Sequence, residues 1–104
     1  MTQPNPKRPD KVQILNPQRG KAMPRIDARK YTLVRRAILH ILRRSQVGIP
    51  FGELADRVSW ELTPGERDTL GSIAWYTTVV KLDLEARGEI ERVPGATPQR
   101  LRRR

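Results

Sequence analysis

Cysteine is absent from this chain of 104 residues, and histidine occurs only once. Without cysteine the chain has no disulfide, thiolate zinc site or cysteine nucleophile. Aromatic residues make up only 5% of the sequence, which argues against a stacking surface for single-stranded nucleic acid. The uninterrupted apolar runs are far shorter than the roughly 20 residues of a membrane-spanning helix. We therefore expect a cytoplasmic protein that has neither a signal peptide nor a membrane partner.

Groups that carry catalysis are scarce as well. The single histidine, His40, lies among arginines on a predicted helix, where a solvated side chain is a simpler interpretation than a general base or a metal ligand. The carboxylates Asp83, Glu85, Glu89 and Glu91 follow one another without a loop of cation-ligand spacing. We therefore expect no catalytic residue, no metal, no cofactor and no small-molecule substrate.

Basic charge is abundant and unevenly distributed. The chain has 21 Lys and Arg against 11 Asp and Glu, a formal net charge of +10, which favours a polyanionic partner. The segment 45–88 holds four basic and seven acidic residues, whereas 89–104 holds five basic and two acidic ones. The protein thus has basic ends and an acidic middle.

The hydrophobic pattern predicts one domain over residues 12–104, after a disordered basic tail over 1–11. Its expected elements are an arm or hairpin over 12–26, helices over 28–44, 52–60 and 72–87, and a β-hairpin over 89–103. With a short strand after the first helix, this order predicts an α+β fold. That fold is a winged helix-turn-helix of three helices and a small antiparallel hairpin, the wing, with a basic N-terminal arm.

Capping residues support these helix bounds. Asp27 and Ser72 are predicted N-caps, because their side chains can accept from amides of the first turn that are otherwise unpaired. Gly88 is the predicted left-handed stop of the third helix. The capping box that begins at Thr63 is interpreted as one turn of helix inside a connecting loop.

The apolar residues of these elements predict a single core. Its expected members are Ile38, Ile41, Leu54, Val58, Val80, Leu84 and Ile90, with Trp60 and Trp75 in it or near it. Asp83 falls on the same apolar side, so we expect an arginine or a backbone amide to pair with it. Leu33 and Leu39 lie outside the core stripe and need cover from the N-terminal arm or from a second copy of the chain.

Four short motifs carry a resemblance to a known group of proteins. They are Ile14-Leu15-Asn16-Pro17, Gly20-Lys21, Ile26-Asp27 and the segment Lys81-Leu82-Asp83-Leu84-Glu85-Ala86-Arg87-Gly88. On these motifs, residues 12–103 resemble a family of small, functionally uncharacterised bacterial winged-helix proteins. The resemblance implies a fold and brings no functional residue with it.

Unneutralised positive charge suggests nucleic acid, and duplex DNA first, as the partner. The duplex is expected to be held by three features. They are the basic N-terminal arm, a basic ridge of Arg29, Arg36, His40 and Arg43 without acids on the first helix, and a cluster of arginines without an acid nearby on the wing. The third helix offers few side chains that read bases, so low sequence specificity is expected. The predicted contact residues are Arg36, Arg43, Ser72, Thr77, Thr78, Lys81, Arg100, Arg102, Arg103 and Arg104.

An alternative from another functional class is a protein-interaction winged helix, acting as a homodimer or an adaptor. In that case the acidic region of the second and third helices meets a partner chain. A positive strip that joins the wing and the third helix favours nucleic acid, whereas a negative third-helix face favours protein.

Overall fold

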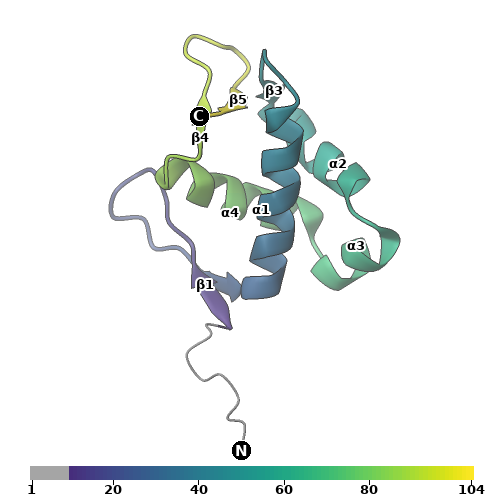
Figure 1. Ribbon diagram of the computed structural model, residues 1–104. Coiled ribbons are helices and arrows are strands. Elements are labelled where there is room, and N and C mark those ends of the chain that lie inside the picture. The colour runs from purple at the N-terminus through teal and green to yellow at the C-terminus, as the bar shows by residue number, and fades with distance from the viewer. Residues whose placement is uncertain (1–9) are drawn as a thin grey trace, which may run out of the picture.

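The structure is a computed structural model that describes residues 10–104 (Figure 1). Of the predicted tail over 1–11, only Asp10 and Lys11 belong to the described residues. The architecture is α+β. Its elements are β1 (Lys11–Gln13), β2 (Arg25–Asp27), α1 (Ala28–Arg43), β3 (Ile49–Pro50), α2 (Phe51–Glu61), α3 (Pro64–Leu70), α4 (Ile73–Ala86), β4 (Ile90–Arg92) and β5 (Arg100–Arg103). The three expected helices therefore appear within one residue of their predicted ends.

The predicted caps begin the helices. Asp27 accepts from the amides of Arg29 and Lys30 at the start of α1, at 2.9 and 3.0 Å. Ser72 accepts from the amide of Trp75 at the start of α4. At both helix N-termini, the oxygen of a short side chain accepts from a first-turn amide that has no acceptor within the helix.

The segment after α2 is more regular than predicted. Where one turn of helix was expected, the capping box of Thr63 and Glu66 begins α3, a helix of seven residues. Leu70, at its end, is 1% exposed and belongs to the core. This apolar anchor stabilises a helix that the local sequence alone leaves marginal.

Two small antiparallel sheets lie at opposite ends of α1 (Figure 1). At its start, β1 pairs with β2, with Val12 opposite Ile26. Near its end, the strands are ordered β3-β5-β4, so the last strand of the chain is the central one. Leu101 in this central strand is fully buried.

The core lies where α1, α2 and α4 meet, and α4 packs against both of the other helices. The predicted core is confirmed: Ile38, Ile41, Leu54, Val58, Val80, Leu84 and Ile90 are all at most 7% exposed. Leu33 and Leu39 are partly buried against it. Val12 of β1 is likewise partly buried against this core, and it lines a surface pocket together with Leu33.

The tryptophans do not join this core, contrary to expectation. Trp60 is 76% exposed and Trp75 is 45% exposed. In α2 the buried positions are Leu54 and Val58, and helical geometry places Trp60 away from them, in line with Asp56. The large aromatic side chain of Trp60 suggested burial, but its position on the side of α2 away from the core leaves it exposed.

Residues 10–104 contain no helix long and apolar enough to cross a membrane. The same residues hold no group of three or more His, Asp or Glu side chains arranged to bind a metal ion.

Candidate functional site

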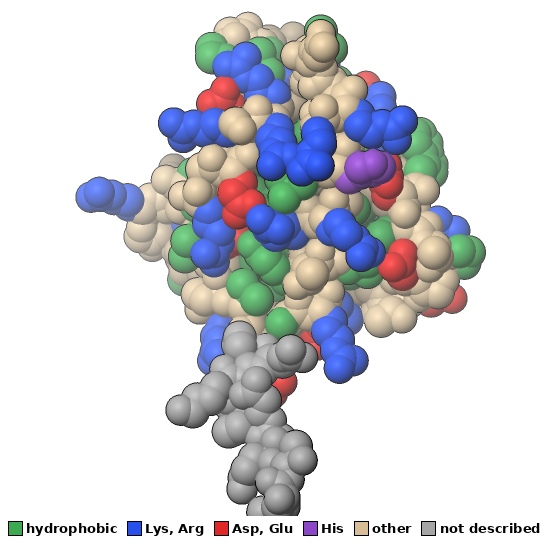
Figure 2. Space-filling model, viewed as in Figure 1, with side chains coloured by type: hydrophobic (Ala, Val, Ile, Leu, Met, Phe, Trp, Pro, Cys, Tyr) green, Lys and Arg blue, Asp and Glu red, His purple; other side chains and the backbone are tan. Residues whose placement is uncertain are grey.

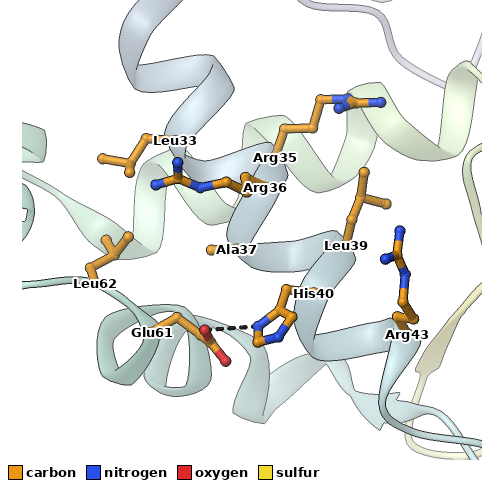
Figure 3. A pocket seen from close by; sticks show the side chains of 9 residues that line it. All are labelled: Leu33, Arg35, Arg36, Ala37, Leu39, His40, Arg43, Glu61 and Leu62. Atoms are coloured by element: carbon orange, nitrogen blue, oxygen red, sulfur yellow. Dashed lines mark hydrogen bonds and ion pairs between the residues drawn. The ribbon is translucent and has the colours of Figure 1, made fainter.

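Basic side chains gather over α1 and beside the β4–β5 hairpin on the face shown in Figure 2. On α1 they surround a pocket of about 400 Å³ between this helix and the end of α2. Arg35, Arg36, His40 and Arg43 form its basic side, with Leu33 and Leu39 as apolar neighbours (Figure 3). We call these four basic residues the α1 face.

Acidic residues from other elements reach this face, so the prediction of a ridge without acids is wrong. Arg35 forms an ion pair with Glu89, Arg36 lies 3.5 Å from a carboxylate oxygen of Glu66, and His40 Nδ1 lies 2.9 Å from Glu61 (Figure 3). The acids come from the end of α2, from α3 and from the turn between α4 and β4, which are distant in sequence but adjacent to α1 in the fold.

Two arginines of the α1 face remain open to a partner. The side chain of Arg36 is 70% exposed, and an ion pair as exposed and as long as its contact with Glu66 contributes little. Arg43 is exposed and forms no ion pair with any residue in the range 10–104. Both predicted contacts on α1 are therefore accessible positive charges.

The wing arginines have more partners than predicted. Arg102 lies opposite Glu91 in the β4–β5 register and forms an ion pair with it at 2.6 Å. Arg104 lies 3.8 Å from the same carboxylate, and Arg100 donates to the carbonyl of Gly48 at 2.9 Å. The expected cluster without an acid nearby is therefore wrong, because antiparallel pairing brings Glu91 between two of its members.

Among Arg100 and Arg102 to Arg104, only Arg103 has neither an ion pair nor a side-chain hydrogen bond within the described residues. Arg103 is exposed and has no ion pair within the described part of the chain. The loop 93–99, which forms the tip of the wing, contains no charged residue. The positive charge of the hairpin therefore lies on its strands, on Arg92 of β4 and on the arginines of β5, and not at its tip.

Glu89 connects this hairpin base to α1. Its carboxylate pairs with Arg35, and its backbone carbonyl accepts from the amide of Arg104 at 3.2 Å. The α1 face and the end of β5 thus belong to one surface, which we call the α1–β5 face.

Two of the four nucleic-acid contacts predicted at helix α4 are wrong. Thr77 is 1% exposed and Lys81 is 3% exposed, so neither can reach a nucleic acid. Lys81 pairs with Glu85 at 2.5 Å, and its Nζ lies 4.6 Å from the ring centroid of Phe51. The error arose because α1, α2 and the wing base enclose most of the circumference of α4.

The remaining exposed side of α4 carries no positive charge. Ser72 and Thr78 are exposed as predicted, and Ala74 and Trp75 lie beside them. A positive strip that joins the wing to this helix is therefore missing, but the exposed positions are not acidic either. Neither of the expected charge patterns is found on α4.

The buried carboxylate of Asp83 is paired, which confirms its predicted role. Its Oδ1 accepts from the amide of Leu15 at 2.9 Å, and its Oδ2 accepts from Arg87 Nε at 2.7 Å and from the hydroxyl of Tyr31. Burial, followed by the bond to Asp83, raises the pKa of Tyr31 to about 12. The bond to Asp83 also raises the pKa of Arg87. These contacts fix the arm to α1 and α4.

Sequence reasoning missed two arginines near the end of α1. Arg44 and Arg57 line a polar pocket together with the predicted Arg100. Arg57 lies four residues after Glu53, a spacing typical of an ordinary helix ion pair. Only the position of Arg44 directly after Arg43 could have indicated this second basic site.

A comparison with protein-family models gives one match, over residues 11–101. The chain belongs to DUF6958, a family of unknown function. The DUF6958 match runs from the start of β1 into β5, and so includes the whole α1 face but not Arg102 to Arg104. Comparisons with curated proteins and with solved structures gave no match. Membership of DUF6958 supports the expected uncharacterised family, but it establishes neither the winged-helix fold nor a bacterial origin.

Proposed function

We propose that this chain is a non-enzymatic protein of winged-helix architecture that binds duplex nucleic acid with little sequence specificity. Duplex DNA is its preferred partner. Its binding surface is the α1–β5 face, and the phosphate backbone is what that face contacts. Helix α4 stays outside the groove. This differs from the usual helix-turn-helix arrangement, in which a recognition helix lies in the major groove.

The element order supports the winged-helix part of the proposal. Helix α1 is followed by the short strand β3, then by α2 and α4 as the helix-turn-helix pair, and then by the β4–β5 hairpin. Strand β5 lies between β3 and β4, so the hairpin is joined to the domain through its second strand. Helix α3 fits as an insertion in the turn between α2 and α4.

The observation that carries the functional proposal is the set of accessible arginines on one face. Arg36, Arg43 and Arg103 have no acid partner or only a weak, exposed one. Arg36 and Arg43 are seven residues apart, which places them about 10.5 Å apart along the helix axis. Duplex DNA carries one charge per roughly 1.7 Å of its axis, so such a row of guanidinium groups lies within reach of several phosphates.

Low specificity follows from the same geometry. Arginines that contact phosphates position a protein but read no sequence. The accessible side of α4 offers Ser72 and Thr78 but no Arg, Asn or Gln, which make the bidentate contacts to base edges. Affinity is therefore expected to depend on salt far more than on sequence.

A fluorescence-anisotropy titration tests the proposal. Random duplex DNA, duplex RNA, single-stranded DNA and poly-glutamate are each titrated at two salt concentrations, with the Arg36→Ala/Arg43→Ala variant beside the parent. We expect the tightest binding to duplex DNA and a clear loss in the variant. Equal affinity for poly-glutamate would show attraction to charge alone and would contradict the proposal.

The exposed tryptophans favour the protein-interaction alternative as a second candidate. Trp60 lies on the acidic helix α2 and Trp75 on the uncharged side of α4, and exposed aromatic residues are enriched at protein interfaces. A parent chain that binds no nucleic acid at low salt, but forms a dimer that Trp75→Ala dissociates in sedimentation, would replace the first proposal with this one.

A further inference from the structure

Three arginines from three different elements line one concave pocket of about 460 Å³. Arg44 follows α1, Arg57 lies in α2, and Arg100 begins β5. The turn between α1 and β3 completes the wall with Ser45 and the backbone around Gly48. Segments distant in the sequence thus bring positive charge to a single hollow, separate from the α1 pocket.

The charge of this pocket is only partly neutralised. Glu53 is the one acid that lines it, and its carboxylate lies 3.3 Å from Arg57 Nη2. Arg44 forms no ion pair within residues 10–104, and Arg100 uses one guanidinium nitrogen for the carbonyl of Gly48. Two of the three positive charges therefore lack a counter-charge from the protein.

The start of α2 lies beside this excess charge, since Pro50 and Glu53 line the pocket. The first turn of α2 receives no side-chain cap. A Cβ added at Gly52 in this turn would meet no atom within 4 Å, so the space there is open. Arginine guanidinium groups and uncapped helix amides can together donate hydrogen bonds to the oxygens of a tetrahedral anion such as phosphate.

From this geometry we infer that the pocket of Arg44, Arg57 and Arg100 is a phosphate-binding site. The ligand chemistry is a phosphate group, supplied either by a backbone phosphodiester or by a small phosphate ester. Its assignment to a backbone phosphate rests on the proposed function. Arg43 and Arg44 are adjacent, so a duplex that contacts the α1 face can continue into this pocket.

An amide chemical-shift titration tests the site without nucleic acid. Pyrophosphate is added to the parent, to Arg44→Gln/Arg57→Gln and to Arg19→Gln at constant ionic strength. We expect saturable shifts at Ser45, Gly52 and Glu53 in the parent. Two lost charge-assisted hydrogen bonds should weaken binding at least about tenfold in the double variant. Arg19→Gln removes an exposed charge of the N-terminal loop and should keep the parent's affinity.

Amide shifts spread over the whole basic surface, or an unchanged affinity in the double variant, would overturn the inference. The spectra of both variants also report whether they remain folded. If the double variant is unfolded, Arg44→Gln alone replaces it, because the Arg44 side chain forms no hydrogen bond or ion pair with residues 10–104.

Duplex binding then separates the two possible sources of the phosphate. If the pocket holds a backbone phosphate, Arg44→Gln/Arg57→Gln should flatten the slope of log affinity against log salt by up to about 2 units. A parent-like slope, with pyrophosphate binding lost, assigns the pocket to small phosphate esters and leaves the proposed function intact. Pyrophosphate binding without any duplex binding supports the site and refutes the proposed function.

Discussion

Replacing Asp83 with Asn tests how the N-terminal arm is fixed to the helices. Asp83 is fully buried and accepts from the Leu15 amide, from Tyr31 and from Arg87. An asparagine keeps the shape and one acceptor oxygen, but its NH₂ group must face donors on one side, either the Leu15 amide or Arg87 and Tyr31. At least one charge-assisted bond is lost, and such bonds contribute about 1.5 to 3 kcal/mol.

The surroundings of Arg87 limit the total cost of this change. Its side chain is 38% exposed, so after the change it can turn to water instead of remaining as a stranded buried charge. We therefore expect Asp83→Asn to lower the free energy of unfolding by about 2 to 3 kcal/mol, below the 3 to 5 kcal/mol typical of a broken buried ion pair. Urea unfolding followed by circular dichroism measures this loss.

Asp68→Asn is the matched control, because Asp68 lies exposed in α3 and should change stability by less than about 0.5 kcal/mol. Hydrogen exchange at the Leu15 amide gives a second readout, since its protection depends on Asp83 alone. The reasoning fails if Asp83→Asn unfolds at the same urea concentration as the parent and keeps this amide protected.

Three further predictions concern other parts of the molecule. Because the pKa of Tyr31 is raised to about 12, stability should fall as pH rises from about 10 to about 12, by up to about 2.7 kcal/mol; absorbance at 295 nm should show a late tyrosinate step that Tyr31→Phe lacks. Lys81→Met should leave the slope of log affinity against log salt for duplex binding unchanged, because Lys81 is buried. A slope flattened by about 1 unit would show that Lys81 contacts a phosphate and that α4 belongs to the interface. Leu84→Ala should cost about 2 to 5 kcal/mol in urea unfolding, and a parent-like melt would remove Leu84 from the core.

Local chemistry explains why the helices could be predicted closely from the sequence. The Asp27 cap and the spacing of apolar residues such as Ile38 and Ile41 act within a few residues of the chain. The same features locate the core residues. Helix α3 was underestimated because its stability comes from the burial of Leu70 in the tertiary structure.

The candidate site was harder to predict because exposure and pairing depend on neighbours that are distant in sequence. A helical projection places Lys81 on the side clear of the apolar face, and only the position of Phe51 shows that this side is covered. Likewise, the β4–β5 register, and not the count of arginines, brings Glu91 to Arg102. Sequence therefore indicated the sign of the surface charge but not which charges are free.

The salt dependence of duplex DNA binding by the parent and by Arg36→Ala/Arg43→Ala tests the central claim most directly. Each phosphate contact contributes about −0.9 to the slope of log affinity against log salt. The double variant should therefore flatten the parent's slope by up to about 2 units, whereas Ser72→Ala/Thr78→Ala on α4 should leave it unchanged. A parent-like slope in the α1 variant together with lost binding in the α4 variant would contradict the account and place the duplex on α4.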